Sequence, residues 1–182
     1  MSYSIGLIEL SSIAAGFEVC DAMLKESDVS LVLSRTICSG KYMVMVKGDV
    51  AAVESAVTAG RTRNEFSVID TFVIPNVDDS LFPAIAGTLN IGTMEAIGIV
   101  ESFSVASLIE AADQMVKSAN VQLMEVRLAM ALGGKAFAVV TGSVSAVRSA
   151  VEAGAQVIGR KGLLVNKVVI PNPRPELLSE LI

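Results

Sequence analysis

The amino-acid sequence predicts an α+β fold with two similar domains, each an antiparallel sheet with helices on one face. An internal repeat is the first observation, because Ile5-Gly6-Leu7-Ile8-Glu9 returns as Ile97-Gly98-Ile99-Val100-Glu101, 92 residues later. Apolar patterns in each copy alternate between the periods typical of strands and of helices. In addition, 52% of the residues are hydrophobic and 18% are charged, which excludes a disordered chain.

The repeat runs through most of the chain. Its offset is 92 residues in the first half of each copy, 94 at a Gly-Lys pair and 96 at an Ile-Pro-Asn triplet. The matching segments are Gly40-Lys41 with Gly134-Lys135 and Ile74-Pro75-Asn76 with Ile170-Pro171-Asn172. Small loop insertions in the second copy account for the increase. We expect one domain over residues 1–90 and another over 95–182, joined by a short linker within 89–94.

The first copy begins with a strand and a helix. Ser4–Leu10 is a short apolar segment typical of a strand. A helix is expected over Ser12–Glu26, where four apolar side chains recur at helical spacing and a serine can cap the N-terminus. The four are Ile13, Phe17, Cys20 and Leu24, and the cap is Ser11 or Ser12. We expect these four side chains to form the apolar face of the helix.

Two strands, a second helix and a last strand follow. Strands rich in Val, Leu and Ile are expected over Val29–Ile37, Tyr42–Lys47 and Ser67–Ile74. Asp49 is expected to cap a helix that ends near Gly60. The second copy repeats this order from Ala96 to Ile170. Strand–helix–strand–strand–helix–strand predicts a ferredoxin-like sandwich in each copy.

Composition excludes several classes of function. The chain has no histidine, so a Ser-His-Asp triad, a zinc–histidine site and imidazole acid–base chemistry are impossible within it. A net charge of -5 argues against binding to nucleic acid or to an anionic membrane surface. The mean hydropathy of +0.62 is high, yet no stretch approaches the roughly 18 apolar residues of a membrane span. We therefore expect a homo-oligomer that covers apolar surface.

The two cysteines have different surroundings in the sequence. Cys20 corresponds to Ala112 in the second copy, so we interpret it as a buried and inert packing residue. Cys38 lies in the tight connection Cys38-Ser39-Gly40, and the matching loop of the second copy contains no cysteine. One cysteine alone is a weak metal signal, and a spare thiol is the simpler interpretation. A threefold axis would favour a metal site over a spare thiol, because it would bring three copies of Cys38 together.

Charged residues recur in both copies. Glu9 and Glu101 follow the first strands, and we expect them to pair with Arg35 and Arg127 as structural ion pairs rather than as acid–base dyads. Lys25 and Lys117 end the first helices, where a cation favours the negative end of the helix dipole. Their recurrence also suits a contact at an edge of an assembly.

The repeated motifs resemble the bacterial microcompartment shell domain. The resemblance rests on Ile-Gly-x-x-Glu, Asp-Ala-Met-Leu-Lys at 21–25, the Gly-Lys loop, Gly48-Asp49-Val50 and the ending Ile170–Pro175. It covers nearly the whole chain and implies a tandem-domain shell protein that forms a homotrimer shaped like a hexamer. With Cys38 in the first pore loop, the chain resembles the T-type tandem shell proteins of propanediol-utilisation compartments. The resemblance implies a structural protein in the shell of a cytoplasmic microcompartment, without an enzyme activity.

The resemblance also assigns roles to residues. It implies that Cys38 of each subunit ligates one [4Fe–4S] cluster per trimer, for electron transfer across the shell. The pore lining that it implies is Ser39, Gly40, Met130, Ala131, Leu132, Gly133 and Gly134. Lys25 and Lys117 stand where shell domains contact neighbouring tiles, and Arg174 matches an edge arginine with two residues interposed in the motif. The partners implied are other shell proteins and an encapsulated redox enzyme, with neither nucleic acid nor membrane.

Two other functions compete with the cluster-bearing tile. One is a plain shell tile whose pore conducts metabolites while Cys38 is a free thiol. The other is a trimeric ferredoxin-like regulator or enzyme with ligand sites between subunits. That class needs charged or aromatic ligand contacts, and the chain has no tryptophan and two tyrosines.

Overall fold

The computed structural model describes residues 3–88, 94–130 and 132–178. Contacts divide the chain into two compact units, Met1–Val77 and Asp78–Ile182. Residues 78–88 therefore belong with the second unit, and most of the expected linker, 89–93, lies outside the described residues. No described helix has the length and apolar character needed to cross a membrane.

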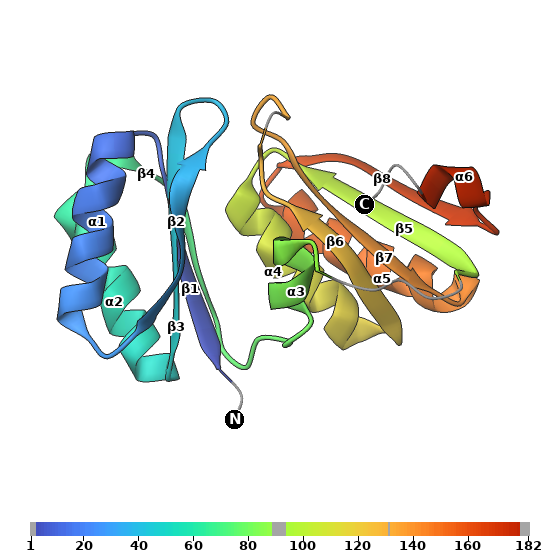
Figure 1. Cartoon of the computed structure of the whole chain (residues 1–182), viewed down its shortest axis with the longest axis horizontal. Coiled ribbons are helices and arrows are strands. Elements are labelled where there is room, and N and C mark those ends of the chain that lie inside the picture. Colours follow the sequence, from blue (N-terminus) through green and yellow to red (C-terminus); the bar gives the residue numbers. More distant parts are fainter. Residues whose placement is uncertain (1–2, 89–93, 131, 179–182) are drawn as a thin grey trace. The chain divides into compact units, whose positions relative to one another are not determined.

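The first unit is a four-stranded antiparallel sheet with two helices on one face (Figure 1). The strand order is β2-β3-β1-β4, so the first strand of the chain is central. Its elements are β1 (Ser4–Leu10), α1 (Ile13–Glu26), β2 (Ser30–Ile37), β3 (Lys41–Gly48), α2 (Val50–Arg63), a 3-10 turn (Glu65–Ser67) and β4 (Val68–Ile74). The predicted α+β architecture is confirmed.

The second unit repeats the sheet with the order β6-β7-β5-β8, again antiparallel throughout. Two short helices that the sequence analysis did not anticipate, α3 and α6, follow the last strand of each copy. The elements are α3 (Leu81–Ala86), β5 (Ala96–Ser102), α4 (Val105–Ser118), β6 (Val121–Arg127), β7 (Ala136–Gly142), α5 (Val144–Arg160), β8 (Leu164–Pro171) and α6 (Pro175–Leu178). Both copies therefore carry the same ferredoxin-like core.

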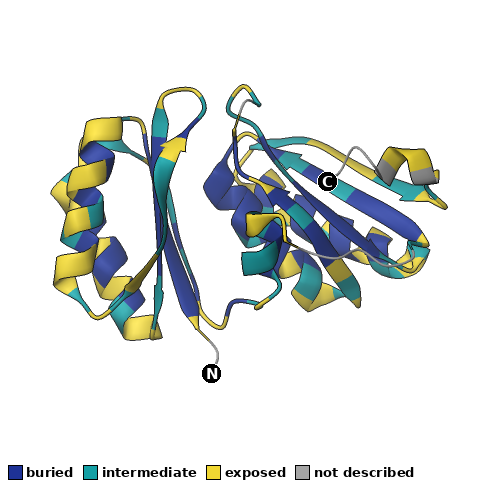
Figure 2. Cartoon of the chain, in the orientation of Figure 1, coloured by how far each residue is buried: buried dark blue, intermediate teal, exposed yellow. Residues whose placement is uncertain are grey.

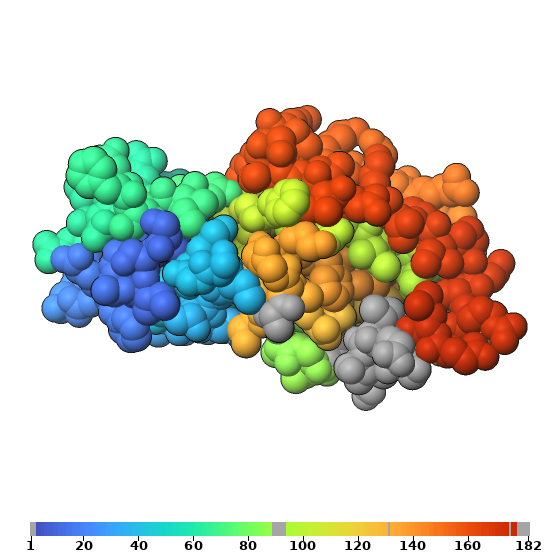
Figure 3. Space-filling view, turned by 90° about the horizontal axis from the view of Figure 1, so that it is seen from above, coloured from blue at the N-terminus to red at the C-terminus, as the bar shows by residue number. Residues whose placement is uncertain are grey.

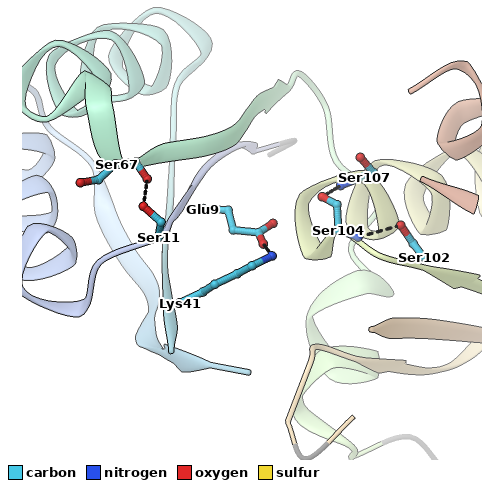
Figure 4. A network of polar contacts seen from close by, with 7 residues as sticks. All are labelled: Glu9, Ser11, Lys41, Ser67, Ser102, Ser104 and Ser107. Carbon is cyan, nitrogen blue, oxygen red and sulfur yellow. Dashed lines mark hydrogen bonds and ion pairs between the residues drawn. The ribbon is translucent and has the colours of Figure 1, made fainter. Parts of the chain in front are cut away.

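Serine caps begin the first helix of each copy, as predicted for the first. The amide of Ala15 donates to Ser12 Oγ at 3.3 Å, and the amide of Ser107 donates to Ser104 Oγ at 3.1 Å (Figure 4). Each bond satisfies one of the backbone donors that a helix N-terminus leaves unpaired. Asp49 stands at the N-cap of α2, but its side chain makes no capping hydrogen bond.

The helical spacing identified a real apolar stripe on α1, but the sheet covers a different one. The buried residues of α1 are Ala15, Gly16, Val19 and Met23. Phe17, in contrast, is 64% exposed, and Cys20 is half-buried rather than buried as predicted. The prediction was wrong because α1 carries two adjacent apolar stripes, and periodicity alone does not show which one meets the sheet. In α4 the counterparts Val105, Ile109 and Ala112 are fully buried.

Gly60 serves packing rather than helix termination. The helix was expected to end near it, but α2 continues to Arg63. Gly60 is buried, and a Cβ there would lie 2.7 Å from both Ile8 Cδ1 and Met23 Cγ. The absent side chain therefore lets α2 approach β1 and α1 closely.

Gly16→Ala tests this close packing. A Cβ at this position would lie 2.8 Å from Tyr42 Cβ and closer still to its ring, and a buried ring moves less readily than a flexible side chain. We expect a net loss of roughly 1–3 kcal/mol in the free energy of unfolding, measured with urea.

Gly159→Ala is the matched control. Gly159 also lies in a helix, and apart from its chain neighbours and the backbone of its own helix, nothing lies within 4 Å of where its Cβ would stand. We expect it to stabilise the chain by up to about 1 kcal/mol through helix propensity. Equal effects of the two substitutions would contradict the packing argument.

Candidate functional site

Cys38 lies in the turn between β2 and β3. Ile37, which ends β2, is buried, whereas Ser39 and Gly40 are exposed and Cys38 is half-buried. Gly40 has a φ of 79°, a conformation that glycine adopts without strain, and nothing lies within 4 Å of where its Cβ would stand. The turn is therefore open on this side while its strand ends are anchored in the sheet. Cys38 forms no disulfide.

The loop 128–135 occupies the corresponding place in the second unit, between β6 and β7. Leu128 and Ala129 are buried at its base, whereas Met130 is 52% exposed. Gly133 and Gly134 both have positive φ, and the amide of Lys135 donates to the carbonyl oxygen of Leu132 at 3.1 Å. Ala131 lies outside the described residues. Both loops lie at the surface (Figure 3).

The two loops differ in what they offer to a ligand. The first carries a thiol, and the second presents an apolar side chain and two glycines. Within the described residues of one chain, no three Cys, Asp or Glu side chains lie close enough to hold a metal ion together. A metal or cluster site built on Cys38 therefore requires further ligands from outside the described residues of this chain, such as Cys38 of other copies.

A buried carboxylate lies near the Cys38 turn. The side chain of Glu9 is 1% exposed, and its Oε1 accepts a hydrogen bond from Lys41 Nζ at 2.8 Å (Figure 4). The predicted pairing with Arg35 is wrong. Strand β3 lies between β1 and β2, and Met43 is directly opposite both Glu9 and Arg35. The Nε atom of Arg35 is buried and has no hydrogen-bond partner among the described residues.

The corresponding prediction for the second unit, a pair between Glu101 and Arg127, is also wrong. Glu101 Oε1 pairs with Lys135 Nζ at 2.6 Å rather than with Arg127. Phe137 is directly opposite both Glu101 and Arg127, and the Arg127 guanidinium lies 5.5 Å from the centre of the Phe137 ring. Arg127 itself pairs with Glu125. The sequence did hold a signal for the true partners, because Lys41 and Lys135 belong to the repeated Gly-Lys pair.

The candidate edge lysines lie in different environments. Lys25 Nζ pairs with Asp21 Oδ2 at 2.6 Å, and the two side chains are 74% and 62% exposed. Lys117 Nζ pairs with Asp113 Oδ2 at the same distance, but these side chains are 36% and 7% exposed. Asp113 also accepts a hydrogen bond from the amide of Asp78 at 2.9 Å. The same motif is therefore exposed in the first unit and partly covered in the second.

Arg174 lies after β8 in an exposed segment. Its guanidinium pairs with Glu176 at 3.1 Å, with side chains 83% and 71% exposed. These hydrogen bonds lower the pKa of the Glu176 carboxyl. Arg174 is therefore exposed, and its edge role stays a prediction.

The chain matches known proteins over its full length. A family model described as the BMC domain matches twice, at residues 4–77 and 96–173. The bacterial microcompartment shell protein PduT of Citrobacter freundii is 44% identical over 100% of this chain and 99% of that protein. The carboxysome assembly protein CcmO of Synechococcus elongatus is 31% identical over 98% of this chain and 68% of that protein.

A solved structure is also similar. The crystal structure of a microcompartment protein from Desulfitobacterium hafniense DCB shares 47% identity and a TM-score of 0.89, with coverage of 98% of this chain and 99% of that one. This similarity extends across both units.

The Glu9–Lys41 pair makes a prediction about stability. We expect Lys41→Ala to lower the free energy of unfolding by roughly 1–3 kcal/mol, because a buried carboxylate loses a charged hydrogen-bond donor. Lys135→Ala is the matched control: Glu101 is 27% exposed and water can replace the lysine, so its loss should stay below about 1 kcal/mol. Urea unfolding of both variants measures the difference, and equal losses would contradict the role given to burial.

Proposed function

The chain belongs to the BMC-domain family as a structural shell protein of a bacterial microcompartment, and we propose that three copies close into a ring of six domains around a pore. It is a building block and not an enzyme, in keeping with relatives that are shell and carboxysome assembly proteins. The observation that carries the proposal is the duplication itself. Two equivalent domains in one chain allow three chains to build a ring with closed symmetry.

Surface chemistry supports assembly of the chain. Phe17, Ile13 and Leu24 leave an apolar stripe exposed on α1, although a single chain of this length normally covers such a stripe. The mean hydropathy of +0.62 is also high for a chain whose described helices include none that could cross a membrane. Contacts between copies would cover this surface.

We further propose that the ring binds one [4Fe–4S] cluster through Cys38. Threefold symmetry would supply three thiolates, one from each chain, and none from the loop at 128–135. Ser39 and Gly40 stand beside the thiol on an open turn, where their backbone N–H groups can donate to cluster sulfides. Such a cluster supplies one-electron transfer, which would let the shell exchange electrons with an encapsulated redox enzyme.

A plain metabolite pore is the second candidate. The observation that favours it is the single thiol per chain, because no three ligands meet among the described residues. In that case Ser39, Gly40, Met130, Leu132 and the two glycines, with Ala131, would line a passage for small polar molecules. Iron content separates the two candidates.

The edges of the ring would meet other shell proteins. Lys25 and Lys117 each keep an aliphatic stem with an ammonium at its end, which can pack along a neighbouring tile and donate to its carbonyl oxygens. We propose that Lys25 and Lys117 contribute the contacts between tiles, whereas the exposed Arg174 is left for contacts within the ring.

The cluster proposal predicts the iron content of two variants. After anaerobic reconstitution, Cys38→Ser should lose bound iron and the visible absorbance of the cluster, while the trimer remains. Cys20→Ser is the matched control, because its thiol packs against the core of the first unit. Full iron binding by Cys38→Ser, or none by the wild-type protein, would leave the plain pore as the function.

The edge proposal predicts a defect in tiling alone. Replacing both Lys25 and Lys117 by alanine should leave the trimer intact in sedimentation equilibrium but stop sheet formation in electron micrographs. Of the single variants, Lys25→Ala should have the larger effect, because the Lys25 side chain is 74% exposed against 36% for Lys117. Sheets formed by the double variant at wild-type concentration would exclude the edge role.

A further inference from the structure

The segment after β4 packs on the second unit. The amide of Asp78 donates to Asp113 Oδ1 at 2.9 Å, and Asp113 Oδ2 holds Lys117 at 2.6 Å. Helix α3 contacts α4 and β6, and its first residue, Leu81, is fully buried (Figure 1). The chain that leaves the first copy of the domain thus covers part of the second copy.

The same segment recurs after β8, where Arg174, Glu176 and Leu177 are exposed. Asn76 and Asn172 have φ values of 53° and 48°, so the backbone turns in the same way after the last strand of each copy. The offset of 96 residues then relates Asp78 to Arg174 and Leu81 to Leu177. Leu177 in α6 is 40% exposed, whereas Leu81 in α3 is 0% exposed.

The first unit carries the counterpart of the surface that α3 covers. The offset of 92 residues relates Asp113 to Asp21 and Leu123 to Leu31. The Asp21 side chain is 62% exposed against 7% for Asp113, and Leu31 is 45% exposed against 0% for Leu123. Figure 2 shows the same contrast between the exposed outer side of α1 and the buried α4. Asp21 uses Oδ2 for Lys25, and its Oδ1 has no partner among the described residues.

We propose that residues 173–178 of one chain dock on α1 and β2 of a second copy, as residues 78–86 dock on α4 and β6 within the second unit. The amide of Arg174 would donate to Asp21 Oδ1 of the second copy, and Leu177 would cover its Leu31. The proposal rests on the proposed ring and names the contact that joins one chain to the next.

Charge favours a second copy as the occupant of this surface. Within the chain, the amide of Asp78 meets the carboxylate of Asp113, and Lys117 pairs with Asp113. The Asp78 carboxylate accepts hydrogen bonds from Ser80 instead. Between copies, Arg174 takes the place of Asp78, so a cation would approach the exposed carboxylate of Asp21. The contact between copies would therefore bring opposite charges together, with Arg174 approaching the carboxylate from the side that Lys25 leaves open.

Crosslinking between engineered cysteines tests the contact. In a background without the native thiols (Cys20→Ala, Cys38→Ser), the pair Asp21→Cys and Arg174→Cys is treated with a short bis-maleimide and separated on a denaturing gel. We expect covalent dimers and trimers. The matched pair Asp78→Cys and Asp113→Cys should crosslink within one chain and remain at monomer mass. A product within one chain for the first pair, or none while the second pair reacts, would overturn the proposal.

Assembly strength gives a second measurement that does not depend on crosslinking geometry. We expect Leu177→Asp to raise the protein concentration needed for half-assembly at least tenfold in sedimentation velocity. Phe66→Asp is the control, because Phe66 is fully exposed and lies outside this surface. An unchanged concentration for Leu177→Asp, or equal shifts in both variants, would overturn the docking contact.

The two proposals fail in different ways. A wild-type protein that stays monomeric at every concentration would refute the ring. A wild-type ring that gives neither the covalent products nor the Leu177→Asp shift would refute only the docking of the C-terminal segment.

Discussion

Close contact between the second helix and the central strand sets the geometry of each domain. A Cβ at Gly6 would lie 2.5 Å from Val57 Cγ2 and 2.7 Å from Val53 Cγ1, and one at Gly98 would lie 2.7 Å from Val147 Cγ1. Because each strand has no side chain at this point, α2 and α5 lie directly on β1 and β5. Interiors are close-packed, so a helix held this near fixes the height of the whole helical layer. The position of α1 and of the strand ends that carry the loops follows from it.

The sequence predicted where strands and helices begin and end better than it predicted which elements and side chains contact one another. Periodicity and the repeat placed every strand and main helix within a few residues, because both copies report the same pattern independently. The predicted ferredoxin-like fold already places β3 between β1 and β2, and the Glu–Arg pairing failed because it took β1 and β2 to be adjacent strands. The side of α1 that is buried depends on the sheet beneath it. The helices α3 and α6 were missed since each is short and shows no helical period.

The sequence identified the residues of the candidate site but not which of them contact one another. Cys38, Ser39 and Gly40 do form an exposed turn at a strand end, as their sequence indicates, and Gly133 and Gly134 do adopt positive φ. The partner of Glu9 was missed although Lys41 is adjacent to the turn. The position of Lys41 next to the turn in the sequence does not show where its side chain points. The register of β3 against β1 places it close enough to Glu9 to form the ion pair. What sequence alone cannot supply is a contact made by a second chain.

Because two domains are fused in one chain, equivalent contacts of the two domains can differ, whereas identical single-domain subunits in a symmetric ring would make the same contact each time. Asp78 reaches Asp113 within the chain, so this contact forms at the effective concentration set by a short connection, which is about millimolar or higher. Its counterpart, Asp21, is exposed in the single chain and pairs there with Lys25, so a contact with a second copy would depend on protein concentration. The two copies can also differ in sequence, because a substitution in one copy leaves the other unchanged. The first copy has Cys38 and Asp49, whereas the second has no cysteine in the matching loop and has Ser143 in place of the aspartate. In a ring of six identical domains every substitution is repeated six times, whereas a ring of three such chains would carry the thiol at three loops and lack it at the three between them.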